Sequence, residues 1–266
     1  MFEMMFVIAI IVENFFPIAL AFFLIRKMKS SWVVVAVGAM AFVISQIIHI
    51  PILQGLAPAW SSEQFLAMPQ MMQNLIYAVT LGFLAGICEE PMRWLSFQIL
   101  HEKGKKVQTG ILLGVGHGGI ESILIVGFSS LANFIILLSL KNGWLAEYPG
   151  VTPDMITQFF GAAWHLPLAS ALERLSAMGV HIGFSLMVWQ SVKHRSWLWF
   201  LGAVLLHALF DALAVMLVSL GLGIWAIEII IFIMAAVVVF WTVKTAKHEW
   251  ELQLANEPTK AEIAAV

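Results

Sequence analysis

Charged residues are scarce in this chain, and their scarcity excludes most classes of soluble protein. Only 11% of the 266 residues are Asp, Glu, Lys or Arg, against about a quarter in an average soluble domain. Hydrophobic residues make up 61%, and the mean hydropathy is +0.92. The formal net charge is −2, and no basic stripe that could bind nucleic acid is present. The composition predicts an all-α polytopic membrane protein and excludes nucleic acid as a partner.

Cysteine is almost absent as well. Cys88 is the single cysteine, so the chain has neither an intramolecular disulfide nor a CxxC metal motif. Internal repeats and low-complexity tracts are lacking, and no composition shift divides the sequence into domains. We therefore expect one membrane domain over residues 1–266, with a polar cytoplasmic tail over 248–266.

Seven apolar stretches approach or exceed the roughly 20 residues that a helix needs to cross a bilayer. They cover residues 4–25, 31–52, 73–100, 108–140, 162–192, 197–219 and 222–244. Pro167 is expected to mark the start of the fifth helix, because proline suits a first turn. Residues 53–72 are expected to form a loop on the outer interface, and residues 151–160 a short surface helix.

Lysine and arginine predict the orientation of the spans. They cluster after the first, third, fifth and seventh spans, as Arg26, Lys27, Lys29, Lys103, Lys105, Lys106, Lys193, Arg195, Lys244 and Lys247. The opposite loops contain only Lys141. Because cytoplasmic loops carry the excess of basic residues, the sequence predicts an outer N-terminus and a cytoplasmic C-terminus. The expected location is the plasma membrane of a bacterium.

Four spans nevertheless contain ionisable residues, which are costly in a membrane and normally mark a functional site. They are Glu89, Glu90 and Arg93 in the third span, His117 and Glu121 in the fourth, His181 in the fifth, and His207 and Asp211 in the sixth. One residue from each span lies about 10 residues, or roughly 15 Å, from the cytoplasmic end of its span. These residues are Glu89, His117, His181 and His207. A common depth in four helices indicates one shared site.

Polar residues within these spans recur four positions apart. The pairs are Glu89 and Arg93, His117 and Glu121, His181 and Ser185, and His207 and Asp211. Residues with this spacing share a helix face, so one member can orient the other by a hydrogen bond. Glu173 and Arg174, nearer the outer end of the fifth span, are interpreted as a structural ion pair with neighbouring helices. His49 is interpreted as an interfacial residue near the end of the second span.

These residue types suit the hydrolysis of an amide. A buried carboxylate can act as general base toward water, and Arg93 can hold one of the two adjacent glutamates ionised. Histidines can either ligate a zinc ion or donate hydrogen bonds to a developing oxyanion. No serine stands in an evident pairing with a histidine and an acid, and Cys88 beside Glu89 is disfavoured as a thiolate nucleophile.

Short sequences around these residues resemble the motifs of a known superfamily. EEPMR (89–93), GVGHGGIES (114–122) and HALFD (207–211) resemble, in order, three motifs of the CAAX-protease and bacteriocin-processing (CPBP) membrane peptidases. Together with HIGFS (181–185), the arrangement is most similar to the YhfC branch, described as intramembrane metalloproteases and related to PrsW-type proteases. The resemblance covers residues 73–219, which would form a four-helix catalytic core.

The resemblance implies an intramembrane endopeptidase acting on a membrane-embedded or lipid-modified peptide substrate. It implies that Glu89 activates the attacking water and that Glu90 and Arg93 shape this base. His207, supported by Asp211, would bind metal or stabilise the oxyanion, as would His117. The candidate metal ligands are His117, His181, His207 and Glu121, with zinc as the candidate ion.

Two functions of other classes remain open. A proton-coupled transporter would use the same cluster as a proton relay, although the sequence has neither an inverted repeat nor paired broken helices. A catalytically inactive membrane protein would bind a helix or an immunity target in the same polar pocket.

Overall fold

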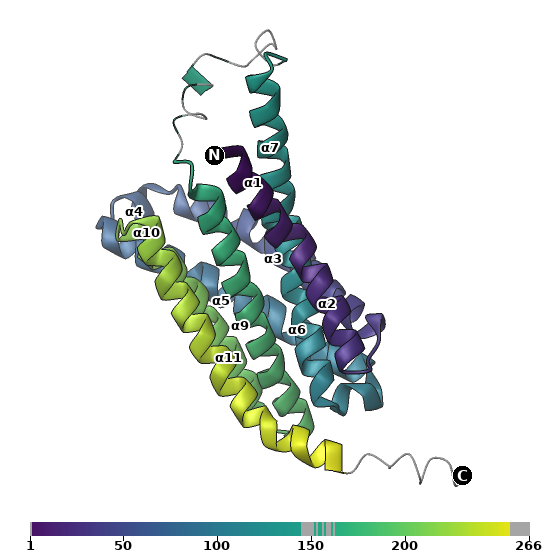
Figure 1. The fold of residues 1–266 in the computed structure, drawn as a ribbon. Helices are drawn as coiled ribbons and strands as arrows, with labels where there is room; N and C mark the ends of the chain where they lie inside the picture. The colour runs from purple at the N-terminus through teal and green to yellow at the C-terminus, as the bar shows by residue number, and fades with distance from the viewer. Residues whose placement is uncertain are drawn as a thin grey trace.

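The computed structural model describes residues 2–144 and 163–255, together with positions 152, 154, 155, 157 and 161. Within these residues, seven helices are long and apolar enough to cross a membrane (Figure 1). They are Phe2–Lys27, Trp32–Trp60, Gln70–Ile99, Val107–Lys141, Leu166–His194, Trp197–Ser219 and Ile224–Lys247. The predicted all-α membrane bundle is confirmed. Most of the expected helix at 151–160, and tail residues 256–266, lie outside the described residues.

Two spans contain a π-helical turn near their middle. The first consists of α1 (Phe2–Ile10), η1 (Ile11–Phe15) and α2 (Phe16–Lys27), and the fourth of α6 (Val107–Glu121), η3 (Ser122–Gly127) and α7 (Phe128–Lys141). The hydroxyl of Ser122 in η3 donates to the carbonyl oxygen of Glu13 in η1 at 2.9 Å. π-helical turns often occur near functional sites, and η3 directly follows Glu121.

Helix α3 (Trp32–Trp60) is longer than predicted, and the outer loop expected at 53–72 is wrong. The helix continues through Pro51 and Pro58, α4 (Glu63–Leu66) follows, and α5 (Gln70–Ile99) begins at Gln70. Proline removes one backbone hydrogen bond, but helices in lipid tolerate it because local adjustments satisfy the freed carbonyl. As a consequence, His49 lies well inside α3 rather than near its end.

Helix α9 (Leu166–His194) is the central element of the bundle. It begins with Pro167 in its first turn, as predicted. In its spanning window 78% of the residues are buried, compared with 17–28% in the other six spans. The remaining helices are the short 3-10 turn η2 (His101–Lys105), α10 (Trp197–Ser219) and α11 (Ile224–Ala255). A helix buried on all sides can present residues to several neighbours at once.

Glycines allow the site-bearing helices to approach one another closely. At Gly82 in α5, an added Cβ would lie 2.2 Å from the carbonyl oxygen of Ala208 in α10. At Gly116 in α6, it would lie 2.0 Å from the carbonyl oxygen of Val35 in α3. Small residues permit such backbone contacts in membranes. These contacts bring the polar residues of α5 and α10, and of α6 and α3, within reach of one another.

Replacing Gly116 by alanine is expected to push α6 away from α3 and to cost about 1–3 kcal/mol of stability. The measurement is the thermal unfolding of the purified protein in detergent. Gly55→Ala is the matched control, because an added Cβ there meets nothing within 4 Å. If both variants unfold at the wild-type temperature, the close contact at Gly116 does not limit stability.

Candidate functional site

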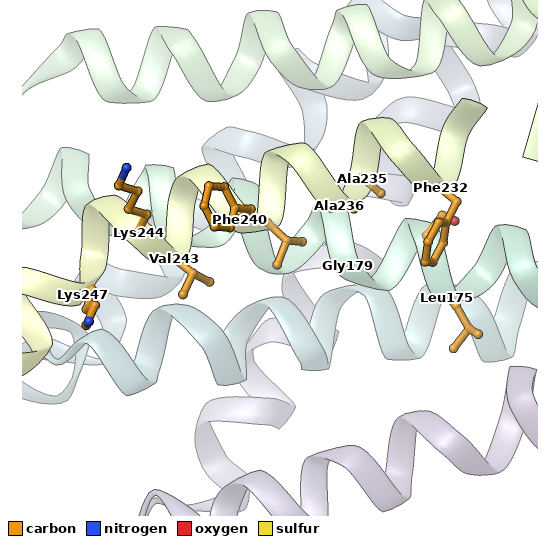
Figure 2. Close-up of a pocket in the computed structure, with 11 residues that line it drawn as sticks. Leu175, Gly179, Phe232, Ala235, Ala236, Phe240, Val243, Lys244 and Lys247 are labelled. Atoms are coloured by element: carbon orange, nitrogen blue, oxygen red, sulfur yellow. The ribbon is translucent and has the colours of Figure 1, made fainter. Parts of the chain in front are cut away.

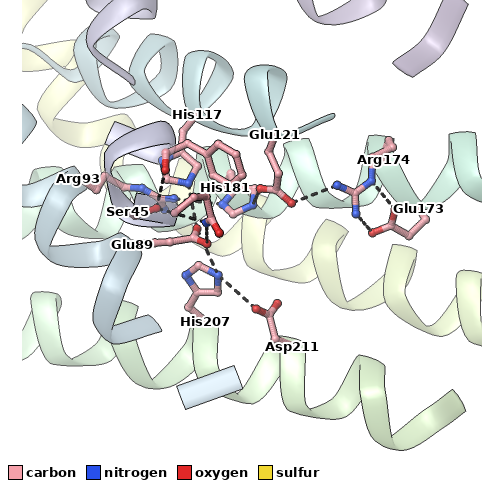
Figure 3. Close-up of polar contacts among 12 residues, drawn as sticks. Ser45, Glu89, Arg93, His117, Glu121, Glu173, Arg174, His181, His207 and Asp211 are labelled. Carbon is pink, nitrogen blue, oxygen red and sulfur yellow. Dashed lines mark hydrogen bonds and ion pairs between the residues drawn. The ribbon is translucent and has the colours of Figure 1, made fainter. Parts of the chain in front are cut away.

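Glu89 on α5 lies at the centre of a polar cluster between helices (Figure 3). Its Oε2 is 2.9 Å from Nε2 of His117 on α6, and its Oε1 accepts a hydrogen bond from Gln46 on α3 at 3.1 Å. Nε2 of His207 on α10 lies 3.8 Å from the same Oε2. Glu89 and both histidines are buried. Residues from three other helices therefore surround one carboxylate.

Glu90 is fully buried and turns toward a different set of partners. Its Oε1 lies 3.1 Å from Nη1 of Arg93 and 2.7 Å from Nδ1 of His207. Arg93 is also fully buried, and its Nη2 donates to Nδ1 of His181 on α9 at 3.1 Å. Arg93 thus compensates the charge of Glu90, while Glu90 orients His207 so that Nε2 faces Glu89.

Glu121 connects the cluster to α9. Its Oε2 lies 2.5 Å from Nε2 of His181, and its Oε1 accepts a hydrogen bond from Nη1 of Arg174 at 3.0 Å. Arg174 also pairs with its neighbour Glu173. The expected ion pair with a neighbouring helix is therefore present at Arg174, which reaches Glu121 on α6, whereas Glu173 pairs with Arg174 on its own helix.

Four of these side chains lie close enough together to hold a metal ion. Glu89, His117, Glu121 and His181 each offer one nitrogen or oxygen atom, and these atoms lie within 4.8 Å of one another. Ligands bound at about 2.1 Å to one zinc ion are at most about 4.2 Å apart, so small side-chain rotations would close this group around an ion. Imidazole and carboxylate are also the donor types of catalytic zinc sites. His207, a ligand candidate from the sequence, lies outside this group, and Glu89 lies inside it.

Metal binding would change the hydrogen bonds of His181, whereas Nδ1 of His117 has no partner to lose within the described part of the chain. Nδ1 of His117 is buried and, among the described residues, has no hydrogen-bond partner. Because Arg93 can only donate, Nδ1 of His181 accepts, and a neutral His181 carries its proton on Nε2 toward Glu121. An ion at Nε2 of His181 would shift this proton to Nδ1, and Arg93 would then pair with Glu90 alone.

A cavity of about 310 Å³ leads from the cluster toward one end of the bundle. Its lining includes Glu89 and His207 at the cluster, and Val218 and Glu228 beside the connection between α10 and α11. Oδ2 of Asp211 lies 3.5 Å from Nε2 of His207, and the Asp211 side chain is 39% exposed. The cavity therefore gives water and a larger molecule a route to the buried carboxylate.

The four-residue spacing predicts the residues of the site better than it predicts their contacts. Among the described residues, one of the four expected pairs is in contact, namely His207 and Asp211. Glu89 contacts His117 instead of Arg93, and Arg93 contacts Glu90 and His181. Glu89, His117 and His181 contact residues of neighbouring helices instead of the residue four positions away on their own helix.

Helix α3 contributes Gln46 and Phe42, which the sequence analysis missed. Gln46 fixes one oxygen of Glu89, and Phe42 packs edge-on against His117 with ring centroids 5.3 Å apart. Both ring nitrogens of His49 are buried and lack a hydrogen-bond partner among the described residues. A signal was present in the sequence, because Gln46 and His49 interrupt the apolar stretch AFVISQIIHI.

Comparison with known proteins extends over nearly the whole chain. The sequence model of the family described as YhfC intramembrane metalloprotease matches residues 11–247, which include every residue of the cluster. A relative from Bacillus subtilis (strain 168), named "Uncharacterized membrane protein YhfC", is 32% identical over 244 residues, covering 87% of this chain and 91% of that protein. The chain therefore belongs to the YhfC intramembrane metalloprotease family.

Proposed function

We propose that this protein is an intramembrane endopeptidase that hydrolyses a peptide bond of a membrane-associated substrate. The observation that carries the proposal is the convergence of Glu89, His117, Glu121 and His181, of which all but His117 line the inner end of a cavity. Buried ionisable groups at this depth are costly and usually serve a site. The name of the family, which includes the word metalloprotease, supports the same reaction class.

Glu89 is proposed as the general base. Its Oε2 faces His117 and His207, and Gln46 holds its other oxygen in place. Because Glu89 lines the cavity, a water molecule at the inner end can donate to Oε2 and transfer a proton to it while attacking the scissile carbonyl. The fixed carboxylate needs no reorganisation before this transfer.

His117, His181 and Glu121 are the proposed metal ligands, and zinc is the ion that this donor set favours. A metal held there would activate the bound water and polarise the scissile carbonyl. Arg174 fixes the second oxygen of Glu121, so this ligand is oriented from α9. Three protein ligands leave the open position that catalytic sites require.

His207 is proposed to deliver a proton to the leaving amine. Glu90 holds its Nδ1, and its Nε2 faces Glu89 at 3.8 Å and Asp211 at 3.5 Å. A protonated His207 can donate from Nε2 either to the leaving nitrogen or to the oxyanion. Asp211, at the cavity wall, would pair with the protonated ring.

The lysine-rich ends of the spans are proposed to face the cytoplasm. In that orientation the cavity extends from the cluster toward the outer side, as far as Val218 on α10 and Glu228 on α11. A peptide segment would therefore approach Glu89 from the outer half of the membrane.

Metal content is expected to distinguish the proposed ligands His117 and His181 from His207, the proposed proton donor. His117→Ala and His181→Ala should lose most of the bound metal, because both are proposed ligands. His207→Ala should retain the wild-type stoichiometry, because His207 lies outside the four-residue group. The measurement is elemental analysis of the purified proteins by plasma mass spectrometry. Equal loss in all three variants would place His207 among the ligands.

Proteolysis itself is tested by comparing the N-termini of membrane proteins from two cell populations, one producing the wild-type protein and one producing Glu89→Gln. We expect new N-termini within or beside spanning segments only in the wild-type population. Identical sets of N-termini in both populations would contradict the endopeptidase proposal.

A further inference from the structure

We propose that this protein binds an anionic phospholipid in a continuous groove outside the polar cluster. The phosphate-bearing headgroup would occupy a lysine-lined pocket, and an acyl chain would lie between α9 and α11. This proposal stands on residues that the hydrolytic mechanism does not use, so it holds or fails independently of the proposed function.

The headgroup pocket has a volume of about 450 Å³ and lies between the α2–α3 connection and the start of α6. Lys27, Lys29, Lys103 and Lys106 line it, and no lining residue carries a carboxylate. Within the described residues none of these four lysines forms an ion pair, although the nearby Lys105 pairs with Glu102. Lys27 Nζ lies 5.7 Å from the centroid of the Phe23 ring, a contact that leaves its positive charge in place. Four ammonium groups around one cavity are complementary to a phosphate.

Two helix N-termini contribute positive potential to the same pocket. Ser31 caps α3, which has 29 residues, and its hydroxyl accepts a hydrogen bond from the amide of Val33 at 3.1 Å. Lys106 precedes α6, which has 15 residues, and the buried Gln108 and Thr109 of its first turn line the pocket. The positive ends of helix dipoles favour anions. They therefore reinforce the lysines where a phosphate would lie.

The lysine-lined pocket continues into apolar space. Lys27, Met28 and Trp250 line both this pocket and a neighbouring cavity of about 380 Å³, whose other walls are mostly apolar. Val243 and Lys247 in turn line both that cavity and a groove of about 680 Å³ between α9 and α11. Shared walls make the three hollows contiguous, with charge at one end and hydrocarbon surface along the rest. An amphiphile with an anionic headgroup matches this distribution.

The groove has the length and lining that an acyl chain needs. Figure 2 shows Lys244 and Lys247 at one end and Leu175 and Phe232 at the other. Gly179 of α9 lies in its wall. The α11 segment from Phe232 to Lys247 is roughly 22 Å long, which exceeds the roughly 15 Å hydrocarbon depth of one leaflet. A lipid of the leaflet on the lysine side can therefore lay a chain along α11.

The excess of basic residues in cytoplasmic loops would by itself explain lysines at the ends of spans. It would not explain why these lysines line one pocket or why an apolar groove adjoins that pocket. Basic pockets between membrane helices bind anionic headgroups. The combination of lysines without a carboxylate partner in the described part of the chain, two helix N-termini and a contiguous apolar groove therefore favours a bound lipid over an orientation signal.

The headgroup contact is tested with the full-length protein in detergent, by native mass spectrometry with added phosphatidylglycerol or phosphatidylcholine. The wild-type protein should bind phosphatidylglycerol more tightly, and Lys29→Gln/Lys106→Gln should weaken that binding about thirty-fold. Lys105→Gln/Lys193→Gln is the control, because it removes the same charge at lysines outside the three hollows. Equal weakening in both double variants would show a net-charge effect and overturn the proposal.

The chain contact is tested with Gly179→Leu, which would fill the groove. An added Cβ at Gly179 meets Val239 Cγ2 at 3.5 Å, an ordinary contact, so the fold should accommodate the change. We expect phosphatidylglycerol binding to weaken about tenfold, as for the loss of two buried methylenes, with no change in the control Gly55→Leu. If Gly179→Leu binds like wild type and glycerol 3-phosphate competes as well as the intact lipid, the pocket holds a soluble anion and the lipid proposal is overturned.

Discussion

Replacing Glu89 by glutamine is expected to lower the rate constant for peptide hydrolysis by about a thousandfold. Glutamine preserves the shape of the side chain and can still hydrogen-bond to His117 and Gln46, but it cannot accept a proton from water. The rate is measured on purified protein with a peptide that spans a cleavage site found by the comparison of N-termini.

Two measurements make this result specific to the base. Glu102→Gln removes the same charge from an exposed residue that pairs with Lys105, and it should cleave at the wild-type rate. The metal content of Glu89→Gln should remain near that of wild type, since His117, His181 and Glu121 are the proposed ligands. A Glu89→Gln protein that cleaves as fast as wild type would remove Glu89 from the chemistry.

Replacing Arg93 by methionine is expected to destabilise the fold by about 3–5 kcal/mol. Arg93 and Glu90 are both fully buried, and Arg93 also donates to His181. Without the guanidinium, the charge of Glu90 would stay buried, with His207 as its one remaining close partner among the described residues. The measurement is the free energy of unfolding in mixed micelles titrated with a denaturing detergent.

Removing both members of the pair distinguishes lost charge compensation from lost packing. Glu90→Gln/Arg93→Met should regain a large part of the stability, because no uncompensated charge remains. Arg26→Met, at an exposed position on α2, is the control for the substitution itself and should change stability little. A double variant no more stable than Arg93→Met would indicate that Arg93 acts through packing rather than through Glu90.

Much of the fold is predictable from the sequence because the thickness of the bilayer sets the length of each apolar run. All seven spans follow from that rule, and the start of α9 at Pro167 follows from the preference of proline for a first turn. The same reasoning fails after residue 52, where Pro51 and Pro58 suggest a break. In lipid, an unpaired backbone carbonyl costs more than a distorted helix, so α3 continues to Trp60.

The identity of the site residues is easier to predict from the sequence than their hydrogen-bond and ion-pair partners. Buried charges such as Glu89 and Arg93 are unusual in lipid and therefore stand out in the sequence. Their partners depend on how neighbouring helices face one another, which the spacing within a single helix does not encode. Uncharged contributors such as Gln46 leave a weak signal, because an amide costs less in a membrane than a charge does.

The central place of α9 has a consequence for how the protein is made. Glu121 and Arg174 are 53 positions apart, so a ribosome adding about 5–20 residues per second needs roughly 3–10 s to deliver the second after the first. During that interval the nascent chain carries Glu121 and Arg93 in the membrane without their α9 partners. Biogenesis must therefore shelter these helices, at the translocon or with an insertase, until the fifth helix arrives.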